Sequence, residues 1–208
     1  QAKSQWPEAE STDKRQTEHV LDLWIRTRLM QTGMDVQKNM EAYQLAAASR
    51  PILDFVLDLS QWYVRRSRDR VKFGSKEDAS AVVNTLREVL CELSCVMAPF
   101  TPFIAEDIYQ KVKNSDGDDS VHWQSWPAYD SADLSEETLQ SMMLVRRVVE
   151  MGLSLRKEAG IKVRQPLQSL VVSNLQLSQE LQQIIGEELN VYEVVFGEKK
   201  QGEGWKVK

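Results

Sequence analysis

The chain has 208 residues, of which 42% are hydrophobic and 27% charged, and its formal net charge at pH 7 is −5. This length can bury a substantial core without disulfides or metals. No apolar stretch approaches the roughly 20 residues of a membrane-spanning helix. The first residues also lack the basic and apolar regions of a secretory signal. With only two cysteines, these features favour a cytoplasmic protein.

The chain offers few ligands for a metal ion and no recognisable catalytic pattern. Cys91 and Cys95 fall one helical turn apart in an apolar stretch, which is typical of small core residues. The only histidines, His19 and His122, are not in ligand spacing, and a zinc site needs about four ligands. There is no glycine-rich phosphate loop and no Ser-His-acid pattern. The sequence therefore predicts no metal, no cofactor and no catalytic residue in this chain.

Apolar residues at helical spacing predict a mainly α fold, in which about five helices form one bundle over residues 17–160. Residues 1–16 are polar and are expected to be a lead-in. Gly33 is a possible weak point of the first helix, and Pro51 predicts a kink or a break in the second. The five helices are expected at residues 17–40, 42–68, 76–97, 101–113 and 135–159.

The pattern changes after Gly160, where short apolar runs rich in valine replace the helical spacing. These runs predict a small α/β subdomain over residues 161–208, which we expect to be truncated at its end. Its elements are expected as a strand at 170–172, a helix at 178–188, a strand at 191–196 and a third strand starting at 205–208.

Charge is unevenly distributed along the chain. Residues 61–76 carry six basic side chains against one acid, a net +5, whereas residues 106–137 carry a net −7. An acidic chain with this polarity can still present one basic surface.

The basic stretch lies at the end of the second predicted helix, in the segment LSQWYVRRSRDR at 59–70. Its arginines could be solvated side chains that suit the negative end of a helix dipole. Alternatively, they form a cluster that contacts phosphates, with aromatic rings nearby for unpaired bases. Trp62 is more readily explained as a core residue than as a stacking residue, but it stays in the candidate set. A second basic stretch, from Arg156 to Arg164, has the same two interpretations.

Six segments of the chain carry a resemblance to a known family. LDLWIRTRL at 21–29 and LSQWYVRRSRDR at 59–70 resemble the first two helices of the anticodon-binding bundle of class I isoleucyl-tRNA synthetases. APFTPFIAEDIY at 98–109 and VHWQSWP at 121–127 are shared with the valyl and leucyl enzymes. LRKEAGIKVRQPL at 155–167 and EELNVYEV at 187–194 look like isoleucyl segments and are the two that separate this family from its relatives.

The resemblance implies that this chain is an RNA-binding part of an isoleucine–tRNA ligase. The whole enzyme would use ATP with magnesium. The "HIGH" and "KMSKS" signatures of the nucleotide-binding fold and the editing domain have no counterpart in this chain. The implied partners are tRNA-Ile and the catalytic and editing domains. The residues expected to contact tRNA are Arg65, Arg66, Arg68, Arg70, Arg26, Arg28 and Trp62, with Lys162 and Arg164 as a second group.

Two alternatives stay open from the sequence. The chain could be the same domain of a valyl- or leucyl-tRNA synthetase, because the helix motifs are shared. It could also be a helical protein-interaction module without an RNA role, which would suit its acidic net charge.

Overall fold

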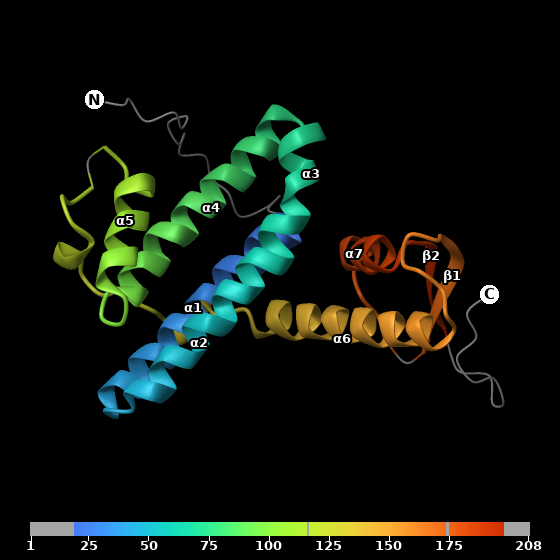
Figure 1. Cartoon of the computed structure of the whole chain (residues 1–208), viewed down its shortest axis with the longest axis horizontal. Helices are drawn as coiled ribbons and strands as arrows, with labels where there is room; N and C mark the ends of the chain where they lie inside the picture. Colours follow the sequence, from blue (N-terminus) through green and yellow to red (C-terminus); the bar gives the residue numbers. More distant parts are fainter. Residues whose placement is uncertain (1–18, 116, 174, 198–208) are drawn as a thin grey trace. The chain divides into compact units, whose positions relative to one another are not determined.

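The computed structural model describes residues 19–115, 117–173 and 175–197 (Figure 1). Its internal contacts divide the chain into two compact units, residues 1–135 and 136–208. The predicted lead-in at 1–16 and the predicted third strand at 205–208 lie outside the described residues.

The first unit is a helical bundle, as the sequence predicts. Figure 1 shows the second long helix, which comprises α2, a π-helical segment and α3, running beside α1 before the chain turns back through α4. The helices are α1 (Val20–Glu41), α2 (Leu45–Asp58), η1 (Leu59–Val64, the π-helical segment), α3 (Arg65–Phe73), α4 (Lys76–Met97) and α5 (Pro102–Val112).

Each helix contributes one apolar stripe to the core of the bundle. On α1, Trp24, Ile25 and Leu29 recur at helical spacing and are at most 2% exposed. Phe55 on α2 and Val89 on α4 are buried in the same way. These side chains leave water together, which is the main term that stabilises such a bundle.

Pro51 does not break the second helix. It lies inside α2, and the helical backbone continues without interruption to Phe73. Proline removes one backbone donor. Its neighbours Ala48, Ile52 and Phe55 are buried in the helix interface, and that burial offsets the lost hydrogen bond. The predicted end of this helix at residue 68 is therefore too early.

The segment between α5 and the second unit contains two short 3-10 helices, η2 (Val121–Trp123) and η3 (Ser131–Asp133). Val121 is buried against Ala105 and Tyr109 of α5. Glu106 fixes the start of η2, because its Oε2 accepts hydrogen bonds from the Ser120 hydroxyl and the Val121 amide, both at 2.9 Å.

Gly33 lies within α1 without weakening it, because the ring of Tyr129 packs directly on its Cα. In an exposed helix, Gly→Ala stabilises by about 1 kcal/mol. Here the added methyl group would overlap the Tyr129 ring. We therefore expect Gly33→Ala to destabilise the first unit by about 1–3 kcal/mol, measured by urea denaturation.

The matched control for Gly33→Ala removes the ring. In a Tyr129→Leu background the overlap disappears, so the same Gly33→Ala change should become neutral or stabilising. An equal cost in both backgrounds would contradict the proposed role of the ring.

The second unit pairs a long helix with a small parallel sheet. Its elements are α6 (Glu136–Glu158), β1 (Leu167–Ser173), α7 (Gln179–Leu189) and β2 (Val191–Gly197). The two strands run parallel, with Leu167 opposite Val191 and Val172 opposite Phe196, and α7 forms the crossover between them. This arrangement confirms the predicted mainly α fold with a small α/β part.

Helix α6 groups with the second unit rather than with the helices before it. It packs against α7, where the side chain of Leu189 lies against Gly152, and Val145 and Val149 are also buried on it. The domain limits 17–160 and 161–208 stay predictions, while the contacts divide the chain between Ser135 and Glu136.

Candidate RNA-binding surface

The arginine-rich stretch has an inner and an outer side, which the spacing of its buried residues determines. Leu59, Tyr63 and Ser67 are buried at intervals of four residues, through the π-helical segment and into α3. Arg70 continues this row and is directed into the bundle. Arg65 and Arg68 fall on the other side of the helix and are exposed. The stretch therefore presents part of its charge to solvent and uses part of it internally.

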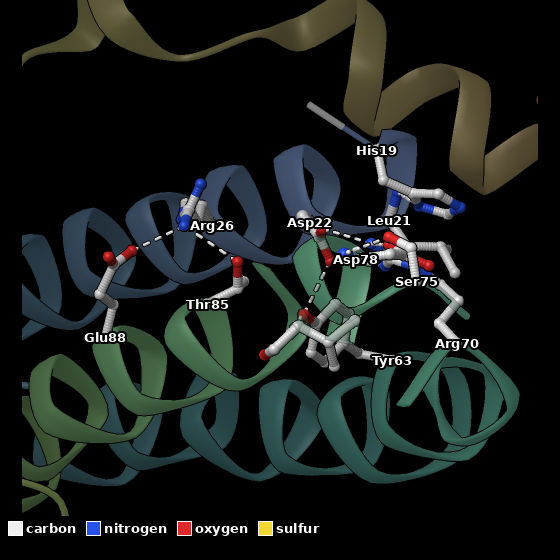
Figure 2. A network of polar contacts seen from close by, with 11 residues as sticks. His19, Leu21, Asp22, Arg26, Tyr63, Arg70, Ser75, Asp78, Thr85 and Glu88 are labelled. Carbon is white, nitrogen blue, oxygen red and sulfur yellow. Dashed lines mark hydrogen bonds and ion pairs between the residues drawn. The ribbon is translucent and has the colours of Figure 1, made fainter. Parts of the chain in front are cut away.

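Arg70 forms the centre of a polar cluster that we call the arginine clasp, made of Asp22, Tyr63, Arg70 and Asp78 (Figure 2). Its guanidinium donates to both oxygens of Asp22, at 2.9 and 2.8 Å, and to Oδ1 of Asp78 at 2.9 and 2.6 Å. The Tyr63 hydroxyl donates to Asp22 at 2.7 Å. The clasp thus ties the start of α1, the end of α3 and the start of α4 together.

The carboxylate of Asp22 and the guanidinium of Arg70 are both largely buried in the clasp. The side chain of Asp22 is 3% exposed and that of Arg70 is 13% exposed. Burial alone would raise the pKa of Asp22, but hydrogen bonds from Arg70 and Tyr63 outweigh it and hold this pKa below its usual value. A buried ion pair is stabilising only when such hydrogen bonds satisfy its remaining lone pairs.

The lowered pKa makes the contribution of Asp22 depend on pH. A carboxyl group whose pKa is lower in the folded state stabilises fully above its unfolded pKa of about 3.9. That stabilisation is lost as pH falls through the folded value. We expect Asp22→Asn to cost about 3 kcal/mol at pH 7, and the difference from wild type should shrink below pH about 4. Urea denaturation of both proteins at pH 7 and below pH about 4 measures this difference in stability. A difference that does not change with pH would contradict the role of the ionised Asp22 carboxylate in the arginine clasp.

The two arginines of α1 also have partners inside the bundle. Arg26 donates to Thr85 at 2.9 Å and to Glu88 at 2.7 Å on α4. Arg28 pairs with Asp58 at 3.0 Å and has a side chain that is 18% exposed. A contact of either arginine with RNA would require these pairs to share or release the guanidinium. Contact of Arg26 and Arg28 with tRNA therefore remains a prediction.

The outward side of α3 carries exposed basic side chains. Arg65 is exposed and donates from Nε to the carbonyl of Gln61 at 2.7 Å, which fixes its direction along the helix. Arg68 is exposed and Arg66 is half-buried. Trp62 is half-buried one turn earlier. We call Arg65, Arg66 and Arg68 the α3 arginines.

Three exposed residues at the end of this surface are not among the predicted contacts. They are Lys72, Phe73 and Lys76, which flank the turn from α3 into α4. The basic run at 61–76 includes the two lysines. The sequence signal for Phe73 is an aromatic residue directly after one of them.

Lys162 and Arg164 lie in the second unit, in the loop between α6 and β1, and both are exposed. Two buried or partly buried side chains hold this loop. Arg156 donates to the carbonyls of Lys162 and Gln165 at 3.1 and 3.0 Å. Asn190 donates to the carbonyl of Val163 at 3.0 Å. The loop therefore presents its two cations on a fixed backbone.

Other chemistry finds little support in the described part of the chain. Within residues 19–115, 117–173 and 175–197, no group of three or more histidine, cysteine or acidic side chains is placed to hold a metal ion. Burial raises the pKa of Cys91 and raises that of Cys95 to about 11, which disfavours the reactive thiolate form of both. None of the helices among these residues has both the length and the apolar character that crossing a bilayer requires.

Comparison with known proteins agrees with these features. Residues 22–171 match the family described as "Anticodon-binding domain of tRNA ligase". The chain is 40% identical over 195 residues to the isoleucine–tRNA ligase of Chlamydia trachomatis serovar D, covering 88% of this chain and 19% of that protein. It is 41% identical over 187 residues to the isoleucine–tRNA ligase of Clostridium novyi, covering 87% of this chain and 18% of that protein.

A helical bundle with an arginine-rich helix end, matched over most of its length, defines the class: the chain belongs to the anticodon-binding domain family of tRNA ligases. Within this class it is homologous to isoleucyl-tRNA synthetases, as the sequence motifs predict. The chain spans only about a fifth of the length of these relatives, 19% in the first of them.

Proposed function

We propose that this chain binds the anticodon stem and loop of tRNA-Ile through the outward side of α3. The observation that carries the proposal is the position of the α3 arginines inside the segment that matches the anticodon-binding family. Guanidinium groups bind phosphate oxygens with short, charge-assisted hydrogen bonds. Loops of RNA expose unpaired bases beside such phosphates.

The proposal is tested by the affinity of the 208-residue chain for an RNA hairpin that contains the tRNA-Ile anticodon stem and loop. Binding should weaken steadily as salt increases, because each neutralised phosphate releases counterions. A hairpin with the same stem and an unrelated loop serves as the control for base recognition. Absence of binding even at low salt would overturn the proposal.

Lys162 and Arg164 are proposed as a second, weaker group of phosphate contacts. Their support is the fixed loop that Arg156 and Asn190 hold. Arg26, Arg28, Arg70 and Trp62 stay predicted contacts of lower rank. The three arginines among them already donate to acidic side chains, and the indole is half-buried.

We further propose that the whole protein attaches isoleucine to tRNA-Ile in the cytoplasm with ATP and magnesium, at domains outside this chain. The support is the name shared by its relatives and the fifth of their length that it spans. Two of the six motifs separate isoleucyl from valyl and leucyl enzymes. Aminoacylation by the whole protein, with isoleucine and valine compared, tests the amino acid.

The remainder of the synthetase is also a proposed partner, and α2 offers a surface for it. Besides its buried stripe, α2 exposes a second apolar side, on which Leu53 is 64% and Leu57 46% exposed. A helix that is apolar on two sides usually has a second neighbour. Substitution of both leucines by serine should leave the stability of the bundle within about 0.5 kcal/mol of wild type and weaken binding of this chain to the remainder of the synthetase supplied as a separate polypeptide.

A further inference from the structure

Phe73 is a large apolar side chain at the end of a helix. It is the last residue of α3 and is 73% exposed. A single exposed apolar side chain is ordinary on a protein surface, but an aromatic ring also offers a flat face on which a planar group can stack. The surroundings of Phe73 therefore decide what it binds.

The backbone that carries Phe73 is held firmly. The Gly74 amide donates to the carbonyl of Arg70 at 3.0 Å, and a side chain at Gly74 would meet that carbonyl and the carboxylate of Asp78. Ser75 then caps α4, since its hydroxyl accepts from the Asp78 amide at 3.1 Å. Arg70 and Asp78 also belong to the arginine clasp. Thus hydrogen bonds on both sides fix the turn from α3 to α4.

One cation lies over the ring, and two more are exposed on the same helix end and turn. The Lys72 ammonium lies 5.0 Å from the centroid of the Phe73 ring. Arg68, one helical turn before Lys72, and Lys76, in the first turn of α4, are both exposed. Two exposed acids, Asp69 and Glu77, lie among them, so the charge of the turn is reduced but stays positive.

We propose that Phe73 is a stacking platform for an unpaired nucleobase of the anticodon loop, with Lys72 and Lys76 as its phosphate contacts. The proposal rests on the proposed function and names the residue that would touch a base. Every nucleobase has a flat face that can stack on an aromatic ring. A cationic rim suits the polyanionic backbone that a flipped-out base brings with it. A purely apolar protein partner would gain nothing from these lysines, which would have to be desolvated.

The test compares Phe73→Ala and Phe73→Trp with wild type in binding to the tRNA-Ile anticodon hairpin, with a fluorescent adenine analogue in its loop. Loss of one base stack should weaken binding by about tenfold and remove the fluorescence quenching that stacking causes. Phe73→Trp should bind at least as tightly as wild type. The dependence of affinity on salt should stay unchanged in Phe73→Ala, because no phosphate contact is lost.

Two controls keep the outcomes separate. Val71→Ala removes another exposed apolar side chain, 47% exposed on the same helix end, and should leave binding unchanged. Phe73→Leu keeps apolar bulk without a π-face and should behave like Phe73→Ala. If wild type binds the hairpin but Phe73→Ala binds equally well, the inference is wrong. If wild type does not bind at all, the proposed function itself fails.

Discussion

Joint replacement of Arg65, Arg66 and Arg68 by glutamine is expected to weaken binding of the tRNA-Ile anticodon hairpin by about a hundredfold at low salt. Each charge-assisted hydrogen bond contributes about 1.5 kcal/mol or more, and the three contacts are not fully additive. The slope of affinity against salt should also fall by about 2, because each lost phosphate contact removes roughly 0.7–0.9 from it. Binding titrations at several salt concentrations measure both quantities.

A second triple variant with the same change in net charge distinguishes RNA binding by the α3 arginines from a general attraction between RNA and basic side chains. Lys38, Arg50 and Lys111 are exposed and lie outside α3, so their joint replacement by glutamine changes the net charge by the same amount. This control should bind within a few-fold of wild type. If both triple variants lose affinity equally, the α3 arginines act only through net charge, and the proposed surface is contradicted.

The sequence could predict the helices of this protein because their signals are local. Ser75 caps α4, whose first turn carries Glu77 and Asp78, and Pro102 opens α5 after Thr101. The continuation of the second helix past Pro51 was not predictable from a local rule. It depends on burial of Ile52 and Phe55 against α1, which is a tertiary effect.

The candidate surface was predictable only in part. The row Leu59, Tyr63, Ser67 and Arg70 is visible in the sequence, and it would have placed Arg70 on the inner side. The basic run was instead treated as a whole. The partner of Arg70 was not predictable, because Asp22 lies 48 residues earlier and nothing in its neighbourhood distinguishes it from a solvated acid of a first helical turn.

The π-helical segment at Leu59–Val64 adds to this difficulty. It widens the turn between α2 and α3 and so changes which residues face the core after it. A strict period of 3.6 residues extrapolated from α2 would place Arg66 in the buried row. In the structure Ser67 is the buried residue there and Arg66 is half-buried.

The largest expected loss of stability in the second unit comes from Arg156→Met. Arg156 is 2% exposed, and besides Lys162 and Gln165 its guanidinium donates to the carbonyls of Leu189 and Asn190, at 2.6 and 3.1 Å. Those last two carbonyls lie at the negative end of α7, where a cation is favoured. Methionine fills the space but leaves the carbonyls without these donors, at a cost of about 3–5 kcal/mol.

This loss should be confined to the second unit. Amide hydrogen exchange is expected to accelerate in β1, α7 and β2, while the amides of α1 and α4 keep their protection. Lys157→Met, at the exposed neighbouring position, should leave amide exchange unchanged in both sets of elements. Arg156→Lys should recover only part of the stability, because one ammonium group cannot reach carbonyls on both the loop at 162–165 and the end of α7. Equal exchange in Arg156→Met and wild type would show that the sheet and α7 hold the loop by themselves, and Lys162 and Arg164 would then keep their positions without the buried arginine.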